Sequence, residues 1–219
     1  QVELMHRQKR ADGFIILYSE KKDPVKDYLL KQKVPFVVVG AAVDNENKVT
    51  YIDNDNKELG REAVNYLQAK GHRKIGFVTD DLFGQVGQER YQGYQEASDN
   101  LNLDVLPELV FSARTIETFK KELERFSPTA LIVKDDLIAL RLIQWLNNQG
   151  FRVPEEYAII SFNNSTFAEI MHPFLTTFDI NIQALAKESV QNLLGILKAT
   201  KIKSQKVIIP FKLIERESV

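Results

Sequence analysis

The stretch that decides the fold is Tyr51 to Val78, YIDNDNKELGREAVNYLQAKGHRKIGFV. It begins with a short strand-like run and a polar turn, and apolar side chains then recur at helical spacing. Asp55 and Glu58 match the D-x-x-E capping box of a helix start, and Gly71 suits the helix end. A second apolar run, residues 75–79, is typical of a parallel strand buried on both faces. The stretch therefore predicts a strand, a helix and a second strand, read together as one βαβ unit.

The same alternation continues on both sides of this stretch. Further strands are predicted at residues 14–18, 36–39, 109–111, 130–133 and 157–162, and further helices at 24–33, up to about 100, 116–126, 136–149 and 182–199. Regular alternation of strands and helices favours doubly wound parallel sheets with right-handed crossovers. One sheet with so many strands would be unusually large, so the sequence favours an α/β fold of two lobes.

Composition narrows the class of protein. A chain of 219 residues with 44% hydrophobic residues can bury a sizeable core. No apolar run approaches the roughly 20 residues that span a bilayer, and no signal peptide opens the chain. The absence of cysteine fits a reducing cytoplasm. The net charge of -1 leaves no evident basic face for phosphates, so we expect a soluble, cytoplasmic protein whose own 219 residues do not grip DNA.

Catalytic motifs are absent from the sequence. It contains no GxGxxG, GxxxxGK[ST], HExxH or GxSxG pattern and no cysteine nucleophile. The acidic pairs at residues 80–81 and 135–136 are adjacent in sequence and point apart, whereas glycosidase carboxylates face each other about 5 to 10 Å apart. Helix capping and solvation explain these pairs. His6 and His172 lack partners at metal-ligand spacing. We therefore predict no catalytic residue, no cofactor and no metal site.

Several short motifs follow one another along the chain. They are Asp55-Asn56-x-x-x-Gly60, Gly71-His72, Arg90-x-x-Gly93-Tyr94, Lys134-Asp135-Asp136, Val153-Pro154 and Leu175-Thr176-Thr177. In this order they resemble the effector-binding region of the lac/gal repressor family of bacterial transcription regulators, over essentially the whole chain. The resemblance implies a periplasmic-binding-protein-like fold. It places residues 1–73 and 178–204 in the first lobe and residues 74–177 and 205–219 in the second.

The resemblance also implies segments that are not present in these 219 residues. Members of the family have a strand, a helix and another strand before the region that starts here, and a DNA-binding helix-turn-helix before those. The first of those strands would be central in a 2-1-3-4-5 sheet, so we expect an N-terminally incomplete first lobe that lacks its middle. Operator DNA would be bound through the absent helix-turn-helix, and a homodimer is implied by the same resemblance.

Polar side chains gather at the predicted strand ends, as in a sugar site. Asp, Asn and Arg match the paired hydroxyls of a sugar, and aromatic rings pack on its C–H faces. By resemblance, Arg90 takes the place of an effector-contacting arginine, Asp55 that of a cleft carboxylate and Asn163 that of an aspartate. Lys134 stands where relatives often carry Asn, and Ser19 ends the strand at 14–18.

Each of these residues also has a plainer interpretation. Arg90 can be a solvated helix residue, Asp55 a helix cap and Asn163 a turn residue. Phe162 and Phe83 lie beside strand ends, where they can stack on a sugar ring or belong to the core. Trp145, the only tryptophan, is expected in the core.

The resemblance is most specific toward maltose-operon repressors of Gram-positive bacteria. It rests on the runs YSEKKDPVKDYLLKQKVPFVVVG at residues 18–40 and LTTFDIN at residues 175–181. It implies the effector-binding core of a transcription regulator that senses maltose or a maltodextrin and shifts operator affinity. An extracytoplasmic sugar-binding protein of a transport system is the alternative, and an enzyme on a similar scaffold is a more remote one.

Overall fold

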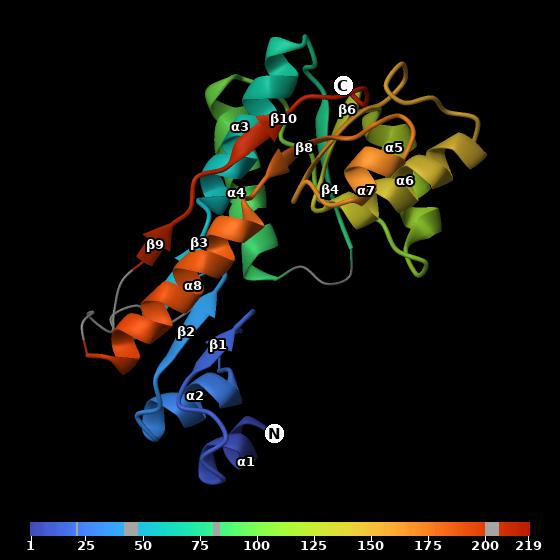
Figure 1. The fold of residues 1–219 in the computed structure, drawn as a ribbon. Coiled ribbons are helices and arrows are strands. Elements are labelled where there is room, and N and C mark those ends of the chain that lie inside the picture. The colour runs from blue at the N-terminus through green and yellow to red at the C-terminus, as the bar shows by residue number, and fades with distance from the viewer. Residues whose placement is uncertain (21, 42–47, 81–83, 200–205) are drawn as a thin grey trace. The chain divides into compact units, whose positions relative to one another are not determined.

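The computed structural model describes residues 1–20, 22–41, 48–80, 84–199 and 206–219. The chain forms two compact units, each built from two segments (Figure 1). Unit 1 comprises Gln1–Asp55 and Asn181–Pro210, and unit 2 comprises Asn56–Ile180 and Phe211–Val219. The predicted α/β fold with largely parallel sheets is confirmed. Among the described helices, none is long and apolar enough to cross a membrane.

Unit 1 contains one parallel sheet. Its strands are β1 (Phe14–Ile16), β2 (Phe36–Val39), β3 (Thr50–Asp53) and β9 (Lys206–Ile208), and its helices are α1 (Val2–Arg7), α2 (Pro24–Lys31) and α8 (Ile182–Leu197). The strands pair in the order β1-β2-β3-β9, and α8 packs along β2 and β3 (Figure 1). The expected gap in the middle of this sheet is wrong, because the four strands pair consecutively and β1 lies at an edge.

Unit 2 contains a six-stranded sheet. Its strands are β4 (Ile75–Thr79), β5 (Leu109–Val110), β6 (Ala130–Val133), β7 (Ala158–Phe162), β8 (Thr176–Asp179) and β10 (Lys212–Ile214). They pair in the order β10-β8-β7-β6-β4-β5, and β10 is antiparallel to β8 while the other neighbours are parallel. Its helices are α3 (Asn56–Ala69), α4 (Gln85–Asn100), α5 (Ile116–Phe126), α6 (Asp136–Asn148) and α7 (Phe167–Ile170).

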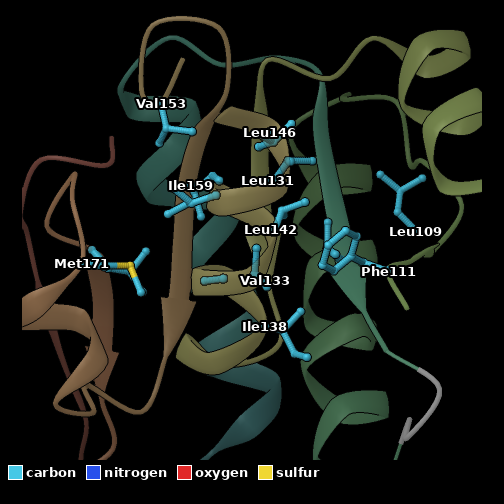
Figure 2. Packing of buried hydrophobic residues seen from close by; sticks show 14 of the residues in the cluster. Leu109, Phe111, Leu131, Val133, Ile138, Leu142, Leu146, Val153, Ile159 and Met171 are labelled. Atoms are coloured by element: carbon cyan, nitrogen blue, oxygen red, sulfur yellow. The ribbon is translucent and has the colours of Figure 1, made fainter. Parts of the chain in front are cut away.

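Successive residues of the strands in unit 2 serve two different cores. Ile75, Phe77 and Ile132 pack with α3 and α4, whereas Val78 and Val133 pack with α5 and α6. Because neighbouring residues of a strand point to opposite faces, the two helix pairs cover opposite faces of the sheet. Figure 2 shows the second core, in which strand residues face a row of α6 side chains, Ile138, Leu142 and Leu146. Trp145 packs against this core, as predicted.

Helices α3 and α4 touch backbone to backbone through two glycines. A Cβ atom on Gly60 would lie 2.0 Å from the Arg90 carbonyl oxygen, and one on Gly93 would lie 1.9 Å from the Lys57 carbonyl oxygen. Only glycine allows so close an approach, since any side chain would collide with main chain. The glycines of the DNxxxG and RxxGY motifs therefore fix the distance between the two helices.

This contact changes the interpretation of the stretch at residues 51–78. Its strand, helix and strand are present as β3, α3 and β4, but β3 belongs to the sheet of unit 1 and β4 to that of unit 2. The three elements are therefore not one βαβ unit. The chain leaves unit 1 after Asp55, because α3 packs on α4 rather than on the first sheet.

The limits of the units differ from the predicted lobe limits at three segments. Residues 178–180 were expected in the first lobe, and they lie in unit 2. Residues 56–73 were expected in the first lobe, and they lie in unit 2 with α4. Residues 205–219 were expected in the second lobe, and of these the described residues 206–210 lie in unit 1, where β9 pairs with β3. The Asn54 side chain also donates a 2.8 Å hydrogen bond to the Ile209 carbonyl and fastens this segment to the end of β3.

Candidate functional site

Arg90 is held by three elements of unit 2 at the carboxyl edge of the sheet. Its side-chain Nε donates to the Asn56 Oδ1 at 3.1 Å, and Nη1 donates to the Lys134 carbonyl at 3.0 Å. Its guanidinium lies 4.3 Å from the centre of the Phe162 ring, within the range of a cation–π contact. The residue is only 5% exposed. Arg90 is therefore a fixed guanidinium, and its interpretation as a solvated helix residue is wrong.

Lys134 forms an ion pair beside this arginine. Its Nζ lies 2.5 Å from the Asp80 Oδ1, and the two side chains are 18% and 20% exposed. The two residues follow β6 and β4, which are neighbours in the sheet, so the pair joins two adjacent strand ends. The positive charge of Lys134 is therefore balanced by the carboxylate of Asp80. The acidic pair at 80–81 was predicted to be solvated, but the Asp80 side chain is largely covered and paired with Lys134.

The two acidic residues at the start of α6 have separate roles. Asp135 is the helix cap and accepts a hydrogen bond from the Ile138 amide at 2.8 Å, as predicted. Asp136 is buried and accepts hydrogen bonds from Ser161 Oγ at 2.5 Å, Thr177 Oγ1 at 2.8 Å and the Ser165 amide at 2.6 Å. It ties the end of β7, the first half of β8 and the segment after β7 to the start of α6. The predicted solvation of Asp136 is wrong.

A strained turn follows β7. Asn163 has a φ of 108° and Asn164 a φ of 49°, and asparagine is among the residues that best tolerate positive φ. The Asn163 amide donates to the Phe178 carbonyl at 2.8 Å. The Asn164 Oδ1 accepts a 2.9 Å hydrogen bond from Nη2 of Arg216, whose Nη1 donates to the Leu175 carbonyl. The interpretation of Asn163 as a turn residue is thus confirmed, and Arg216 braces the same turn.

The structure places the predicted site residues in different parts of the molecule. Arg90, Lys134, Phe162 and Asn163 lie together at the ends of β6 and β7 and on α4 in unit 2. Phe162 is fully buried, stacks on Phe178 at 5.6 Å and lies under Arg90, so its ring supports the arginine.

The remaining predicted residues lie elsewhere. Asp55 and Ser19 belong to unit 1. Asp55 is exposed and directly precedes α3, while Ser19 is buried and its hydroxyl has no hydrogen-bond partner among the described residues. Phe83 lies outside the described residues.

Four residues of this region were missed as site residues. Asn56 and Asp136 stand inside quoted motifs, where they were read only as part of a pattern. Asp80 and Arg216 reach partners 54 and 52 residues away in sequence, and no local pattern indicates such pairs. Within the described part of the chain, no group of three His, Cys, Asp or Glu residues could hold a metal ion.

Replacing Asp136 by Asn is expected to destabilise this region. In one orientation of the new amide, its oxygen would still accept from the two hydroxyls, but its N–H would face the Ser165 amide N–H. In the other orientation, its oxygen would accept from the Ser165 amide, but its N–H would face the two hydroxyls. Leaving a buried donor without an acceptor costs about 1 to 3 kcal/mol. Urea unfolding should show a loss of this size. Asp135→Asn, which retains a capping side chain, should change stability by less than about 0.5 kcal/mol. Equal losses in the two variants would contradict the role of Asp136.

Comparison with known proteins identifies the fold family. Residues 64–219 match the family described as periplasmic binding protein-like domain. The chain belongs to this family. Similar proteins include MalR of Staphylococcus xylosus, an HTH-type transcriptional regulator, with 29% identity over 223 residues. That match covers 100% of this chain and 65% of the relative, so the chain spans just under two thirds of its length.

Solved structures agree with this assignment. A probable maltose operon transcriptional repressor of Staphylococcus aureus superimposes with a TM-score of 0.89 at 28% identity, covering 99% of this chain and 79% of the other. A complex of the transcriptional regulator CelR with cellobiose gives a TM-score of 0.86 at 26% identity, covering 99% and 69%. The resemblance to the lac/gal repressor family is confirmed, and these relatives are regulators rather than enzymes.

Proposed function

We propose that this chain is the effector-binding core of a LacI-family transcription regulator and that its effector is maltose or a short maltodextrin. The observation that carries the proposal is the fixed Arg90 guanidinium, which lies with the Lys134–Asp80 pair and the Asn163 turn at one edge of the sheet. Open α/β sheets bind ligands at the carboxyl ends of their strands. A set of charged donors and acceptors at this edge suits the hydroxyls of a neutral sugar.

The relatives support a glucose-based saccharide. One similar structure is a probable repressor of a maltose operon, and another is a regulator in complex with cellobiose. The same relatives do not favour the alternative of a transport binding protein. In our proposal, the regulator works in the cytoplasm, and operator DNA is bound by a segment outside these 219 residues.

The sugar would act by shifting a population. It can change operator affinity only by binding one state of the regulator more tightly than the other. Arg90 would supply fixed donors that lose little entropy when the sugar arrives, since Asn56, Lys134 and Phe162 already hold the guanidinium.

Calorimetry with the full-length polypeptide tests this function. The panel should contain maltose, maltotriose, glucose, ribose and galactose. We expect maltose or maltotriose to bind with a dissociation constant in the micromolar range, about -8 kcal/mol, and ribose and galactose to bind far more weakly. A folded protein that binds none of these sugars would refute the effector assignment.

We also propose that unit 2 contributes to a homodimer. Helix α6 packs against the short helix α7. Leu137 in the first turn of α6 and Phe167 and Ile170 on α7 are exposed. Ile170 is 66% exposed. Apolar side chains gathered on a surface are typical of a protein–protein contact.

Replacing Ile170 by Asp is expected to weaken this dimer. A charge buried at an apolar interface without a partner costs several kcal/mol, so the dimer dissociation constant should rise at least about tenfold. Sedimentation velocity over a concentration series would measure the change. Ile182→Asp is the matched control, because Ile182 is 58% exposed on α8 of unit 1. A dimer that resists Ile170→Asp, or that dissociates equally with Ile182→Asp, would exclude this surface.

A further inference from the structure

A cavity lies beside the Lys134–Asp80 pair, and apart from Asp80 its lining residues are not part of the proposed site. Its volume is about 400 Å³, within the range of roughly 300 to 1,000 Å³ typical of small-molecule sites. It is lined by Asp80, Phe111, Ser112, Ala113, Ile116, Ile138 and Arg141, all in unit 2. These residues come from the end of β4, the segment after β5, the first turn of α5 and the first half of α6.

The cavity lies along the same sheet edge as Arg90. Arg90 rests on Phe162 at the end of β7, and the strands continue from there as β6, β4 and β5. Neighbouring strands are about 4.8 Å apart, so the end of β5, where Phe111 follows, is roughly 14 Å from the end of β7. Asp80 and Lys134 lie between them, at the ends of β4 and β6. Arg90 also contacts the Lys134 carbonyl at the end of β6, and from there Phe111 is two strand spacings away, about 10 Å. A ligand that touches Arg90 and reaches Phe111 at the far wall of the cavity therefore contains more than one ring.

The cavity belongs to the opposite side of the sheet from α4. Phe111 and Ile138 are members of the core under α5 and α6. In Figure 2, Ile138 lies at the end of that core where the strand that carries Ile159, which is β7, reaches its carboxyl end. The ion pair of Asp80 with Lys134 therefore stands between the arginine and the cavity, and Asp80 lines the cavity itself.

The lining combines the groups that recognise a neutral sugar ring. Arg141 is exposed, and in the described part of the chain no carboxylate pairs with its guanidinium. Ser112 offers a hydroxyl that already exchanges a 3.1 Å hydrogen bond with Thr115, and Asp80 offers an acceptor. Ile116 and Ile138 supply apolar surface for C–H groups. Because Lys134 neutralises the Asp80 carboxylate, the lining offers hydrogen-bond donors and an acceptor, which match the hydroxyls of a sugar.

We propose that this cavity is a second sugar subsite, which holds a further glucosyl ring of a maltodextrin whose first rings lie at Arg90. The inference rests on the proposed function and goes beyond it. It makes Arg141 the residue that determines preference for longer chains, and it predicts that the regulator senses a maltodextrin rather than maltose alone.

Calorimetry with maltose, maltotriose and maltotetraose tests the subsite in the full-length polypeptide. We expect maltotriose or maltotetraose to bind wild type about tenfold more tightly than maltose, as one charged hydrogen bond provides. Arg141→Leu should remove this gain and leave maltose affinity within about twofold. The control is Gln144→Ala, an exposed change on the same helix, which should keep the gain.

Each outcome separates the two hypotheses. Equal affinity of wild type for all three sugars, or an equal loss for maltose and maltotetraose in Arg141→Leu, would overturn the subsite and leave the maltose assignment standing. Wild type that binds no sugar at all would overturn the proposed function and this inference with it.

Fluorescence gives a second readout that reports on the cavity directly. Trp145 is the only tryptophan, and its ring packs edge-on against Phe111 with 5.9 Å between ring centres. A ring that fills the cavity contacts Phe111 and should change the Trp145 emission. We expect a spectral change with maltotetraose and none with maltose. Tight binding of maltotetraose with unchanged emission would place the extra ring elsewhere.

Discussion

Replacing Arg90 by Ala is expected to reduce maltose affinity about 100-fold or more while the protein still folds. Two charged hydrogen bonds of about 1.5 kcal/mol each account for a loss of this size. The substitution should also lower the free energy of unfolding by about 2 to 3 kcal/mol, because Asn56 and the Lys134 carbonyl lose their donor and Phe162 loses its cation. Calorimetry and urea unfolding would measure the two effects.

Two further variants separate charge from geometry at this position. Arg90→Lys keeps the charge but loses the planar fork, so it should restore little of the affinity. Arg125→Ala is the matched control, since Arg125 also lies over a phenylalanine, Phe126, at 5.1 Å, but on an exposed part of α5. It should leave affinity unchanged and stability within about 0.5 kcal/mol. Sugar affinity that survives Arg90→Ala would remove this residue from the site.

Replacing Gly93 by Ala is expected to lower the free energy of unfolding by about 3 kcal/mol or more. The new Cβ would lie 1.9 Å from the Lys57 carbonyl oxygen, so α3 and α4 would have to move apart along their whole contact. For a chain of this size, the melting temperature should fall by roughly 6 to 12 °C. Sugar affinity should fall too, because the Asn56–Arg90 hydrogen bond spans the same two helices.

An adjacent residue provides the control for this prediction. Gln92 is exposed on α4, and Gln92→Ala should change stability by no more than about 0.5 kcal/mol. Gly60→Ala should reproduce the Gly93→Ala effect, since its Cβ would meet the carbonyl oxygen of Arg90 itself. A Gly93→Ala protein that melts like wild type would mean that the two helices are not held in backbone contact.

Local sequence patterns predicted most helices and strands, because the periodicity and capping residues of such an element lie within one short stretch of the chain. The apolar runs of β4, β6 and β7 and the caps and glycines of the helices belong to this class. The short helix α7 was missed, since four residues hold no periodicity. The sequence also could not indicate that β3 and β4 enter different sheets. That outcome is decided by the contact of Gly60 with α4, which joins residues 30 positions apart.

The site was predictable only in part, for the same reason. Arg90, Lys134 and Asn163 were identified through a family resemblance, and the structure brings them to one edge of unit 2. Their partners were not identified. Asp80 meets Lys134 because β4 and β6 are neighbours, and Arg216 reaches Asn164 from the second segment of unit 2. Asp136 was read as a solvated residue because nothing local reveals that three donors converge on it.

The interleaved course of the chain has a consequence for its synthesis. Unit 1 is made of Gln1–Asp55 and Asn181–Pro210, with most of unit 2 between them. A ribosome adds about 5 to 20 residues per second, so the 155 residues from Asp55 to Pro210 take roughly 8 to 30 s. During that interval β1, β2 and β3 have emerged without α8 or β9, while the strands β4 to β8 can already assemble. The nascent chain would therefore complete unit 1 only after most of unit 2 has left the ribosome.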